Sequence, residues 1–208
     1  SDENDLLIDC FAGKGTNIIS GAYHNRRVIG YDLSPANLQL IRTACLENTA
    51  IREQDLILHN SCGIDMVEYE KDHNIVDLFL LDPPYIFGAE KYGDDDRDLC
   101  NSKDLETFND RFEKCLTNMK RLIKPSNFKS KIFKPIIIKV GSGRRGETGL
   151  IDMATEIEII CRRLNLVLHD KIFNELNSAF QSYNLGRCIE NRYTVKSHET
   201  NLVFVKYT

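Results

Sequence analysis

Residues 75–85, IVDLFLLDPPY, join an apolar strand pattern to a stiff polar turn. The run is rich in β-branched and aromatic residues, which is typical of a parallel strand covered on both faces. Pro83 and Pro84 cannot donate ladder hydrogen bonds, so we expect the strand to end before them. Ligands bind beyond the carboxyl ends of strands in open α/β sheets, which predicts Asp82 and Tyr85 at a site. The fixed φ of both prolines makes the turn stiff. A stiff turn suits chemistry that needs a carboxylate, a backbone carbonyl and an aromatic face held in a fixed arrangement. A plain proline turn with Tyr85 as packing is the alternative.

A second polar turn, at residues 9–15, follows the first apolar run and precedes a helical pattern. Gly13 and Gly15 allow the backbone to approach a ligand closely, and a helix N-terminus offers unpaired amides. The turn resembles the dinucleotide fingerprint, but Ile18 stands where the third glycine is expected. A nucleoside without pyrophosphate therefore fits this turn better than a dinucleotide, with an ordinary tight turn as the alternative.

Polar residues also end the second and third expected strands. Asp32 follows residues 27–31, where an acid can accept both ribose hydroxyls or cap the next helix. Asn60 and Ser61 follow residues 55–59, where polar groups could meet an adenine edge or simply form a turn. The ends of the first three expected strands thus carry residues suited to a nucleoside, and the fourth strand ends at Asp82. We therefore expect a nucleoside site next to Asp82.

The remaining elements position these turns. We expect strands at residues 5–10, 27–31, 55–59, 75–81, 135–140, 166–172 and 202–207, and helices at residues 16–23, 35–48, 104–123 and 150–164. This alternation predicts an α/β fold with a mostly parallel sheet, an antiparallel end and helices on both faces. We expect one domain over residues 1–208, without a separate target-recognition domain, and a mobile loop at residues 86–102 over the site.

Composition limits the classes of protein further. The chain of 208 residues has a net charge of −4, so any nucleic-acid binding must use local basic patches or a partner. No apolar run is long enough to span a bilayer. Seven cysteines without CxxC spacing indicate reduced thiols of an intracellular protein. The five histidines form no ligand cluster, so we expect no metal site.

Together, the segments DCFAGKGT, IGYDLSP and LLDPPY resemble the S-adenosylmethionine-dependent methyltransferases that modify exocyclic amines of nucleic-acid bases. The similarity covers nearly the whole chain, and residues 192–206 are similar to the end of many DNA adenine-N6 enzymes. It implies a single Rossmann-like seven-stranded methyltransferase sheet and S-adenosyl-L-methionine as cofactor. The implied cofactor-binding residues are Asp9, Phe11, Ala12, Gly13, Gly15, Asp32, Leu33, Asn60 and Ser61. The implied catalytic residues are Asp82, Pro83, Pro84 and Tyr85.

The resemblance implies methyl transfer to an exocyclic amine. An aspartate at position 82 favours N6 of adenine over N4 of cytosine, where serine is commoner, and the similarity of the C-terminal segment favours DNA. Asp82 and the Pro83 carbonyl would accept hydrogen bonds from the amine, Tyr85 would stack on the base, and a duplex would have to flip that base out. The family's N-terminal cofactor segment would precede residue 1, and no long insert is available for target recognition. We therefore expect that segment or a partner subunit to contribute recognition of the DNA.

Basic residues near the expected site are candidates for contacts with nucleic-acid phosphates, with a solvated loop or an ordinary hairpin as the alternative. These residues are Arg144, Arg145, Arg187, Arg192 and Lys196.

Three other interpretations stay open. Gly141, Gly143 and Gly146 form a literal GxGxxG between an expected strand and helix, which is typical of a nucleotide-binding oxidoreductase. The acid expected about 20 residues later is missing, which disfavours that class. RNA guanine-N2 or adenine-N6 methyltransferases share the cofactor turn and a DPPY-like motif. A non-catalytic methyltransferase subunit is disfavoured by the intact DPPY.

Overall fold

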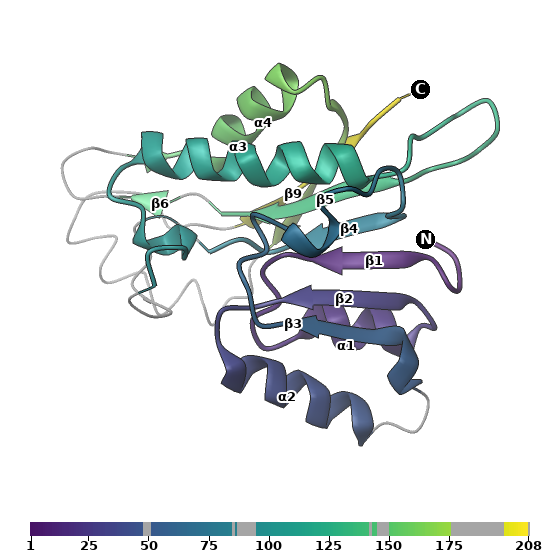
Figure 1. Ribbon diagram of the computed structural model, residues 1–208. Coiled ribbons are helices and arrows are strands. Elements are labelled where there is room, and N and C mark those ends of the chain that lie inside the picture. Colours follow the sequence, from purple (N-terminus) through teal and green to yellow (C-terminus); the bar gives the residue numbers. More distant parts are fainter. Residues whose placement is uncertain are drawn as a thin grey trace.

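The computed structural model describes residues 1–47, 51–84, 86, 95–141, 143–144, 150–175 and 198–207. Its main sheet has seven strands in the order β3-β2-β1-β4-β5-β9-β8 (Figure 1). The strands are β1 (Leu6–Asp9), β2 (Arg27–Tyr31), β3 (Leu56–His59), β4 (Leu78–Leu81), β5 (Pro135–Val140), β8 (Val167–Glu175) and β9 (His198–Val205). The first five are parallel, and β9 runs antiparallel between β5 and β8. The predicted seven-stranded, mostly parallel sheet with an antiparallel end is confirmed.

Helices cover both faces of this sheet, as the sequence predicts. Figure 1 shows α1 (Thr16–Tyr23) and α2 (Pro35–Leu46) below it, and α3 (Leu105–Leu122) and α4 (Met153–Arg163) above it. Strand residues alternate between two buried layers. Leu7 and Val28 pack with the α1 and α2 side, whereas the next residues, Ile8 and Ile29, pack with the α3 and α4 side. This period of two is the physical basis of the layered fold.

The helix starts follow the capping residues in the sequence. Ser34 caps α2, its hydroxyl accepting a hydrogen bond from the Asn37 amide at 3.3 Å, and Pro35 takes the first helical position. Asp104 caps α3 through the Thr107 amide, with 2.8 Å between oxygen and nitrogen. These caps fix where the two helices leave the sheet edges.

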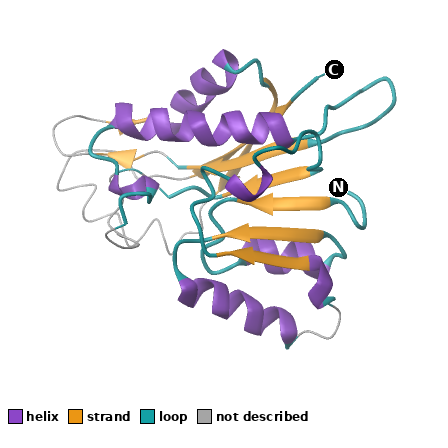
Figure 2. Ribbon diagram, in the orientation of Figure 1, coloured by secondary structure: helices purple, strands orange, loops and turns teal. Residues whose placement is uncertain are grey.

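Four predicted boundaries differ from the structure by three residues or more. β8 ends at Glu175 and not at Ile172, and β9 begins at His198 and not at Leu202. β4 begins at Leu78 and not at Ile75, because Val76 forms an isolated bridge with Ile123 at the end of α3. α4 begins at Met153 and not at Leu150. The residues before it pair as a small antiparallel ribbon of β6 (Gly143–Arg144) and β7 (Leu150–Ile151), drawn in orange in Figure 2.

Short helical turns complete the described elements. They are the 3₁₀ turns η1 (Glu53–Asp55), η2 (Val67–Tyr69) and η3 (Leu99–Asn101). The last of these lies inside the segment that we expected to be only a loop, residues 86–102, and residues 85, 87–94 of this region lie outside the described part. In the described part of the chain, no helix has the length and apolar character to cross a membrane.

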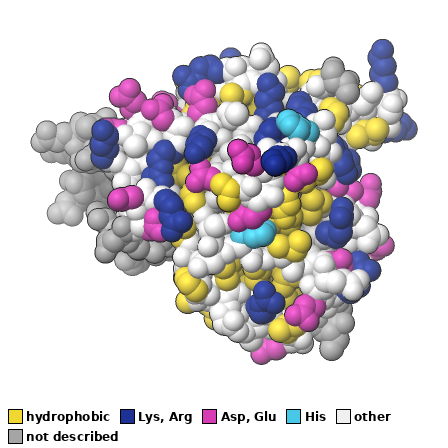
Figure 3. Space-filling model, in the orientation of Figure 1, with side chains coloured by type: hydrophobic (Ala, Val, Ile, Leu, Met, Phe, Trp, Pro, Cys, Tyr) yellow, Lys and Arg dark blue, Asp and Glu magenta, His cyan; other side chains and the backbone are white. Residues whose placement is uncertain are grey.

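The charged surface and the cysteines can be compared with what the composition predicts. Basic and acidic side chains are interspersed on the face shown in Figure 3, without a large patch of one sign. Cys10, Cys45, Cys115 and Cys161 are buried free thiols. No group of metal-binding side chains is found among the described residues.

Candidate active site

A cavity of about 860 Å³ opens where the carboxyl ends of the central strands meet. The turn after β1 forms one wall of this cavity and the turn after β4 forms another. The segments that contribute are residues 9–14, 31–34, 61–64, 80–84 and 97–99, with Lys139 from β5 and Glu199 and Asn201 from β9. The glycine turn and the Asp82-Pro83-Pro84 segment, far apart in sequence, therefore face a single space.

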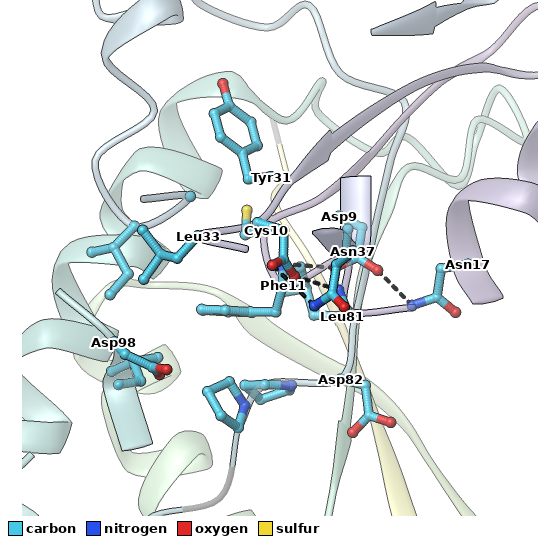
Figure 4. A pocket seen from close by; sticks show the side chains of 18 of the residues that line it. Asp9, Cys10, Phe11, Asn17, Tyr31, Leu33, Asn37, Leu81, Asp82 and Asp98 are labelled. Carbon is cyan, nitrogen blue, oxygen red and sulfur yellow. Dashed lines mark hydrogen bonds between the residues drawn. The ribbon is translucent and has the colours of Figure 1, made fainter. Parts of the chain in front are cut away.

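Asp9 is a buried carboxyl in the wall of the cavity, with 1% of its surface exposed. Its Oδ1 accepts a hydrogen bond from the Phe11 amide at 2.9 Å, and its Oδ2 accepts one from Asn17 Nδ2 at 2.8 Å (Figure 4). Burial raises the pKa of Asp9 to about 7, against the lowering effect of these bonds, and the nearby Asp82 and Asp32 charges add to the rise. Asp9 is thus a carboxyl that can change charge near neutral pH.

The carboxylate of Asp32 connects the β1 turn to the start of α2. Its Oδ2 accepts a hydrogen bond from the Gly13 amide at 2.8 Å. Its Oδ1 accepts bonds from the Ser34 amide at 2.8 Å and from Asn37 Nδ2 at 3.1 Å. The acid therefore caps the helix, which is one of the two roles that the sequence left open, and it lines the cavity. Its binding of ribose hydroxyls stays a prediction.

Asn60 and Ser61 have different positions relative to the cavity. Asn60 Nδ2 donates to the backbone oxygens of Asp32 and Leu33, both at 3.1 Å, and Asn60 does not line the cavity. Its amide nitrogen holds the turn after β2 in place. Ser61 does line the cavity, and its hydroxyl donates to Glu68 Oε1 at 3.1 Å. A carboxylate only accepts, so the lone pairs of the Ser61 hydroxyl remain for an acceptor role.

Close packing against a side chain or the backbone explains two glycines of the site. Gly15 has φ +91°, and a Cβ there would lie 2.4 Å from Ile41 Cγ1 of α2. Gly63 lines the cavity, and a Cβ there would lie 2.3 Å from the backbone oxygen of Cys10. Such distances are shorter than any real contact of a Cβ atom. The sequence analysis identified Gly15 but missed Gly63, whose only signal is a glycine shortly after a strand end.

Asp82 emerges from β4 beside two charged residues that the sequence analysis missed. Lys139 Nζ lies 3.0 Å from Asp82 Oδ2 and 3.0 Å from Glu199 Oε2. The side chain of Asp82 is 44% exposed, that of Lys139 is 35% exposed and that of Glu199 is 18% exposed. A sequence signal did exist, because Lys139 is the one charged residue in the strand PIIIKV.

The wall facing these strands is formed by residues 97–99. Figure 4 shows Asp98 across the cavity from Asp82. The segment is held by Arg111 Nη1, which donates to the Asp98 backbone oxygen at 2.8 Å, and by the Cys62 thiol, which contacts the Arg97 backbone oxygen at 3.7 Å. The sequence analysis placed this stretch over the site but assigned none of its residues.

Several predicted site residues cannot be placed. Tyr85, Arg145, Arg187, Arg192 and Lys196 lie outside the described residues, and of Arg144 only the backbone is described, in β6. The GxGxxG interpretation of residues 141–146 is wrong in its structural premise, because Gly143 is part of a strand and α4 starts only after β7. A dinucleotide fingerprint needs a turn that opens directly into a helix.

Comparisons with known proteins agree with this architecture. Solved S-adenosylmethionine-dependent methyltransferases superpose on nearly the whole chain. This chain has the Rossmann-like methyltransferase fold. An S-adenosylmethionine-dependent methyltransferase from Methanosarcina mazei superposes with a TM-score of 0.63 at 12% identity, over 100% of this chain and 94% of that one.

Two further structures show how varied proteins of the methyltransferase fold are. An rRNA methylase from Streptococcus thermophilus has a TM-score of 0.56 at 14% identity, over 100% of this chain and 90% of that one. Geranyl diphosphate C-methyltransferase from Streptomyces coelicolor A3(2), solved with S-adenosyl-L-homocysteine, has a TM-score of 0.62 at 12% identity, over 99% and 74%. No protein-family model and no curated protein matches the chain.

Proposed function

We propose that this protein transfers a methyl group from S-adenosyl-L-methionine to the exocyclic amine of a nucleic-acid base, with N6 of adenine in DNA as the target. One observation carries the proposal. The Asp82-Pro83-Pro84 turn and the glycine turn that begins at Asp9 line the same cavity, although about 70 residues separate them in sequence. A methyl donor and a methyl acceptor need such neighbouring sites.

The donor set of the cavity fits this cofactor. Its volume of about 860 Å³ lies in the range of small-molecule sites. Asp32 and Ser61 offer acceptors toward a nucleoside, and the carboxyl of Asp9, which ionises near neutral pH, lies in the wall of the same cavity. S-adenosyl-L-methionine carries both a nucleoside and positive charges, and when bound it supplies an electrophilic methyl group. The cofactor-binding solved structure from Streptomyces coelicolor adds support through its shared fold.

The acceptor side is supported by Asp82 and the rigid turn after it. An exocyclic amine is a poor nucleophile because its lone pair is delocalised into the base. Hydrogen bonds from the amine to the Asp82 carboxylate and to the Pro83 carbonyl localise that pair on nitrogen. A bound S-adenosyl-L-methionine would supply the methyl carbon, with its C–S bond replaced by the new C–N bond, while Asp82 and the Pro83 carbonyl hold the amine nitrogen. The amine would release one proton to solvent. No hydrogen bond to Asp82 Oδ1 is found within the described ranges, so this oxygen is the one we assign to the amine.

RNA is the second candidate substrate. The rRNA methylase among the similar structures supports it, because its fold matches all of this chain. The choice of DNA rests on the sequence similarity of residues 192–206, most of which lie outside the described residues. The two substrates differ in sugar, so the products can be separated directly.

The proposal is tested by mass analysis of nucleosides from DNA and RNA incubated with the protein and S-adenosyl-L-methionine. We expect N6-methyldeoxyadenosine from DNA. Asp82→Ala abolishes the product and leaves cofactor affinity largely unchanged. Asp110→Ala, an exposed acid on α3 away from the cavity, is the matched control and keeps full activity. Detection of a methylated ribonucleoside alone would identify RNA as the substrate. The absence of any methylated base would contradict the proposal. Binding of NAD in place of labelled S-adenosyl-L-methionine would support an oxidoreductase.

A further inference from the structure

Three charged side chains meet at the ends of three neighbouring strands. Lys139 of β5 lies between Asp82, which follows β4, and Glu199 of β9, with 3.0 Å from its nitrogen to one oxygen of each carboxylate. All three line the cavity. The three side chains form a carboxylate–lysine–carboxylate cluster.

The sheet register dictates this meeting. β4 and β5 pair Leu80 with Ile137, so continuing the parallel register sets Asp82 beside Lys139 on the same face. β5 and β9 pair Lys139 with Asn201, and Glu199 lies two residues from Asn201 on the same face. Side chains diagonal to each other across a pair of strands are within reach of a lysine. The cluster is therefore built into the sheet.

We propose that Lys139 is a positioning residue of the active site, whose ammonium group separates the carboxylates of Asp82 and Glu199 and keeps Asp82 an acceptor of hydrogen bonds. The inference rests on the proposed function for its catalytic part. Its electrostatic part concerns only these three side chains and can be tested without any substrate.

The physical reason is the proximity of two like charges. Both carboxylates bond to the same nitrogen, so their oxygens lie no further apart than twice 3.0 Å. Without a cation between them, two carboxylates that close share a proton, and one of the two pKa values rises strongly. A protonated Asp82 would present a donor where the target amine needs an acceptor.

The surrounding charges increase the need for a cation. Asp9 on β1 is close enough to Asp82 for the two charges to influence each other, and Asp32 ends β2 on the same cavity. The other charged side chains that line the cavity, within the described part of the chain, are Lys14, Arg97 and Asp98. Arg97 is already ion-paired with Asp95 at 2.7 Å, and no ion pair joins Lys14 to a described residue.

Lys139 is suited to stay charged in this place. Burial alone would lower the pKa of Lys139, but the bonds and charges of Asp82 and Glu199 together outweigh burial and raise it above its ordinary value. One Asp82 oxygen, Oδ2, is then fixed by the lysine, which orients Oδ1 for the amine. Glu199 binds the ammonium group from the other side, which keeps the lysine in place when a substrate binds.

The electrostatic part is tested by carbon-13 NMR titration of the side-chain carboxyl groups in the free protein. In Lys139→Met, which keeps the length of the side chain, we expect Asp82 or Glu199 to titrate at least one pH unit higher than in the wild type. In Lys139→Met/Glu199→Gln the Asp82 titration returns toward the wild-type position, because the carboxylate of Glu199 is removed. Unchanged carboxyl titration in Lys139→Met overturns the proposal.

If that variant does not fold, Asp82→Asn is used in its place. There Lys139 should lose its proton at lower pH than in the wild type, and an unchanged lysine titration also overturns the proposal.

The catalytic part is tested by the pH profile of methyl transfer. We expect the acid limb of the kcat–pH profile of Lys139→Met to lie at least one pH unit above that of wild type, because kcat falls tenfold for each pH unit below the pKa of Asp82. The double variant should return this limb toward the wild-type position, and Lys139→Arg should keep the wild-type profile. A purely structural role predicts no rescue by Glu199→Gln, so a double variant as weak as Lys139→Met overturns the catalytic part. A wild-type protein that methylates no base would refute the proposed function, whereas the NMR titration would still decide the role of Lys139.

Discussion

The carboxylate of Asp32 accepts a hydrogen bond from the backbone amide of Gly13, with 2.8 Å between Oδ2 and nitrogen. The other oxygen of Asp32 accepts from the Ser34 amide and the Asn37 side chain at the start of α2. One side chain thus joins the glycine turn to the next helix, and both segments line the cavity. Changing Asp32 should therefore alter cofactor binding and local stability together.

We expect Asp32→Ala to weaken binding of S-adenosyl-L-methionine by about tenfold or more, measured by isothermal titration calorimetry. It should also lower the free energy of unfolding by about 1–3 kcal/mol, because three hydrogen bonds to the carboxylate are lost. Asp104→Ala removes the cap of α3 away from the cavity and serves as the control. The control should lose about 1 kcal/mol of stability without losing affinity. Equal affinity of Asp32→Ala and wild type would rule out a role for Asp32 in binding.

The strands β2 and β5 could be predicted from the sequence because local signals set both of their ends. β2 begins and ends as expected, and β5 matches the run PIIIKV. The meeting of Asp82 with the glycine turn could also be expected, because parallel strands present their carboxyl ends at one edge. For these features, the apolar pattern of each strand and the parallel direction of the strands are enough to predict which residues meet.

Contacts between distant strands could not be predicted in the same way. The pairing of Lys139 with Asp82 and Glu199 depends on the register of β4, β5 and β9, and a shift of one residue turns a side chain to the other face. Gly63 is required by the approach of the Cys10 backbone, which no local pattern announces. β6 and β7 were missed because two-residue strands leave almost no periodic signal.

Asp77 is a buried ion-pair centre at the end of the sheet opposite the cavity. Its side chain is 3% exposed and lies 2.7 Å from Lys124 Nζ and 2.9 Å from Lys134 Nζ. Its Oδ2 also accepts a hydrogen bond from the Leu6 amide at 2.9 Å. We expect Asp77→Asn to lower the free energy of unfolding at pH 7 by about 2 kcal/mol, since Lys124 loses its counter-charge and Lys134 keeps only Asp5 as an ion-pair partner.

This effect should depend on pH in a defined direction. Burial alone would raise the pKa of Asp77, but the Leu6 amide and the two lysines outweigh it and lower the pKa. The stabilisation is therefore present above about pH 4 and is lost as the pH falls toward and below the lowered pKa. Urea unfolding of wild type and Asp77→Asn at pH 3 and pH 7 measures the difference. A difference that stays constant over this range would show that the ion pairs do not stabilise the fold. Cofactor affinity of the folded variant should match wild type.

Arg192 lies outside the described residues, and its contact with nucleic acid stays a prediction from the sequence. We expect Arg192→Ala to weaken DNA binding and to reduce the slope of log affinity against log salt by about 1, because one phosphate contact is lost. Lys129→Ala, an exposed lysine that precedes β5 at the edge opposite the cavity, is the matched control and should leave the slope unchanged. Equal loss of DNA and cofactor binding in Arg192→Ala would instead indicate a folding role.

Asp9 predicts an unusual dependence of stability on pH. Its pKa is about 7 in the folded protein because of burial, against 3.8 as the ordinary value. Between these two values the folded state holds a proton that the unfolded state has lost, so the Asp9 contribution to stability falls as the pH rises. The slope is at most about 1.4 kcal/mol per pH unit for one proton, and it levels off above pH 7.

Asp9→Asn removes this ionisation while keeping a side chain of the same shape. We expect the variant to gain stability relative to wild type as the pH rises from 5 to 8, measured by urea unfolding at each pH. Its loss of the Phe11 or Asn17 hydrogen bond should appear as a constant offset over the same range. Asp110→Asn, an exposed acid on α3, should show no pH-dependent difference from wild type. A stability difference between Asp9→Asn and wild type that does not change from pH 5 to pH 8 would mean that Asp9 is already ionised in the folded protein.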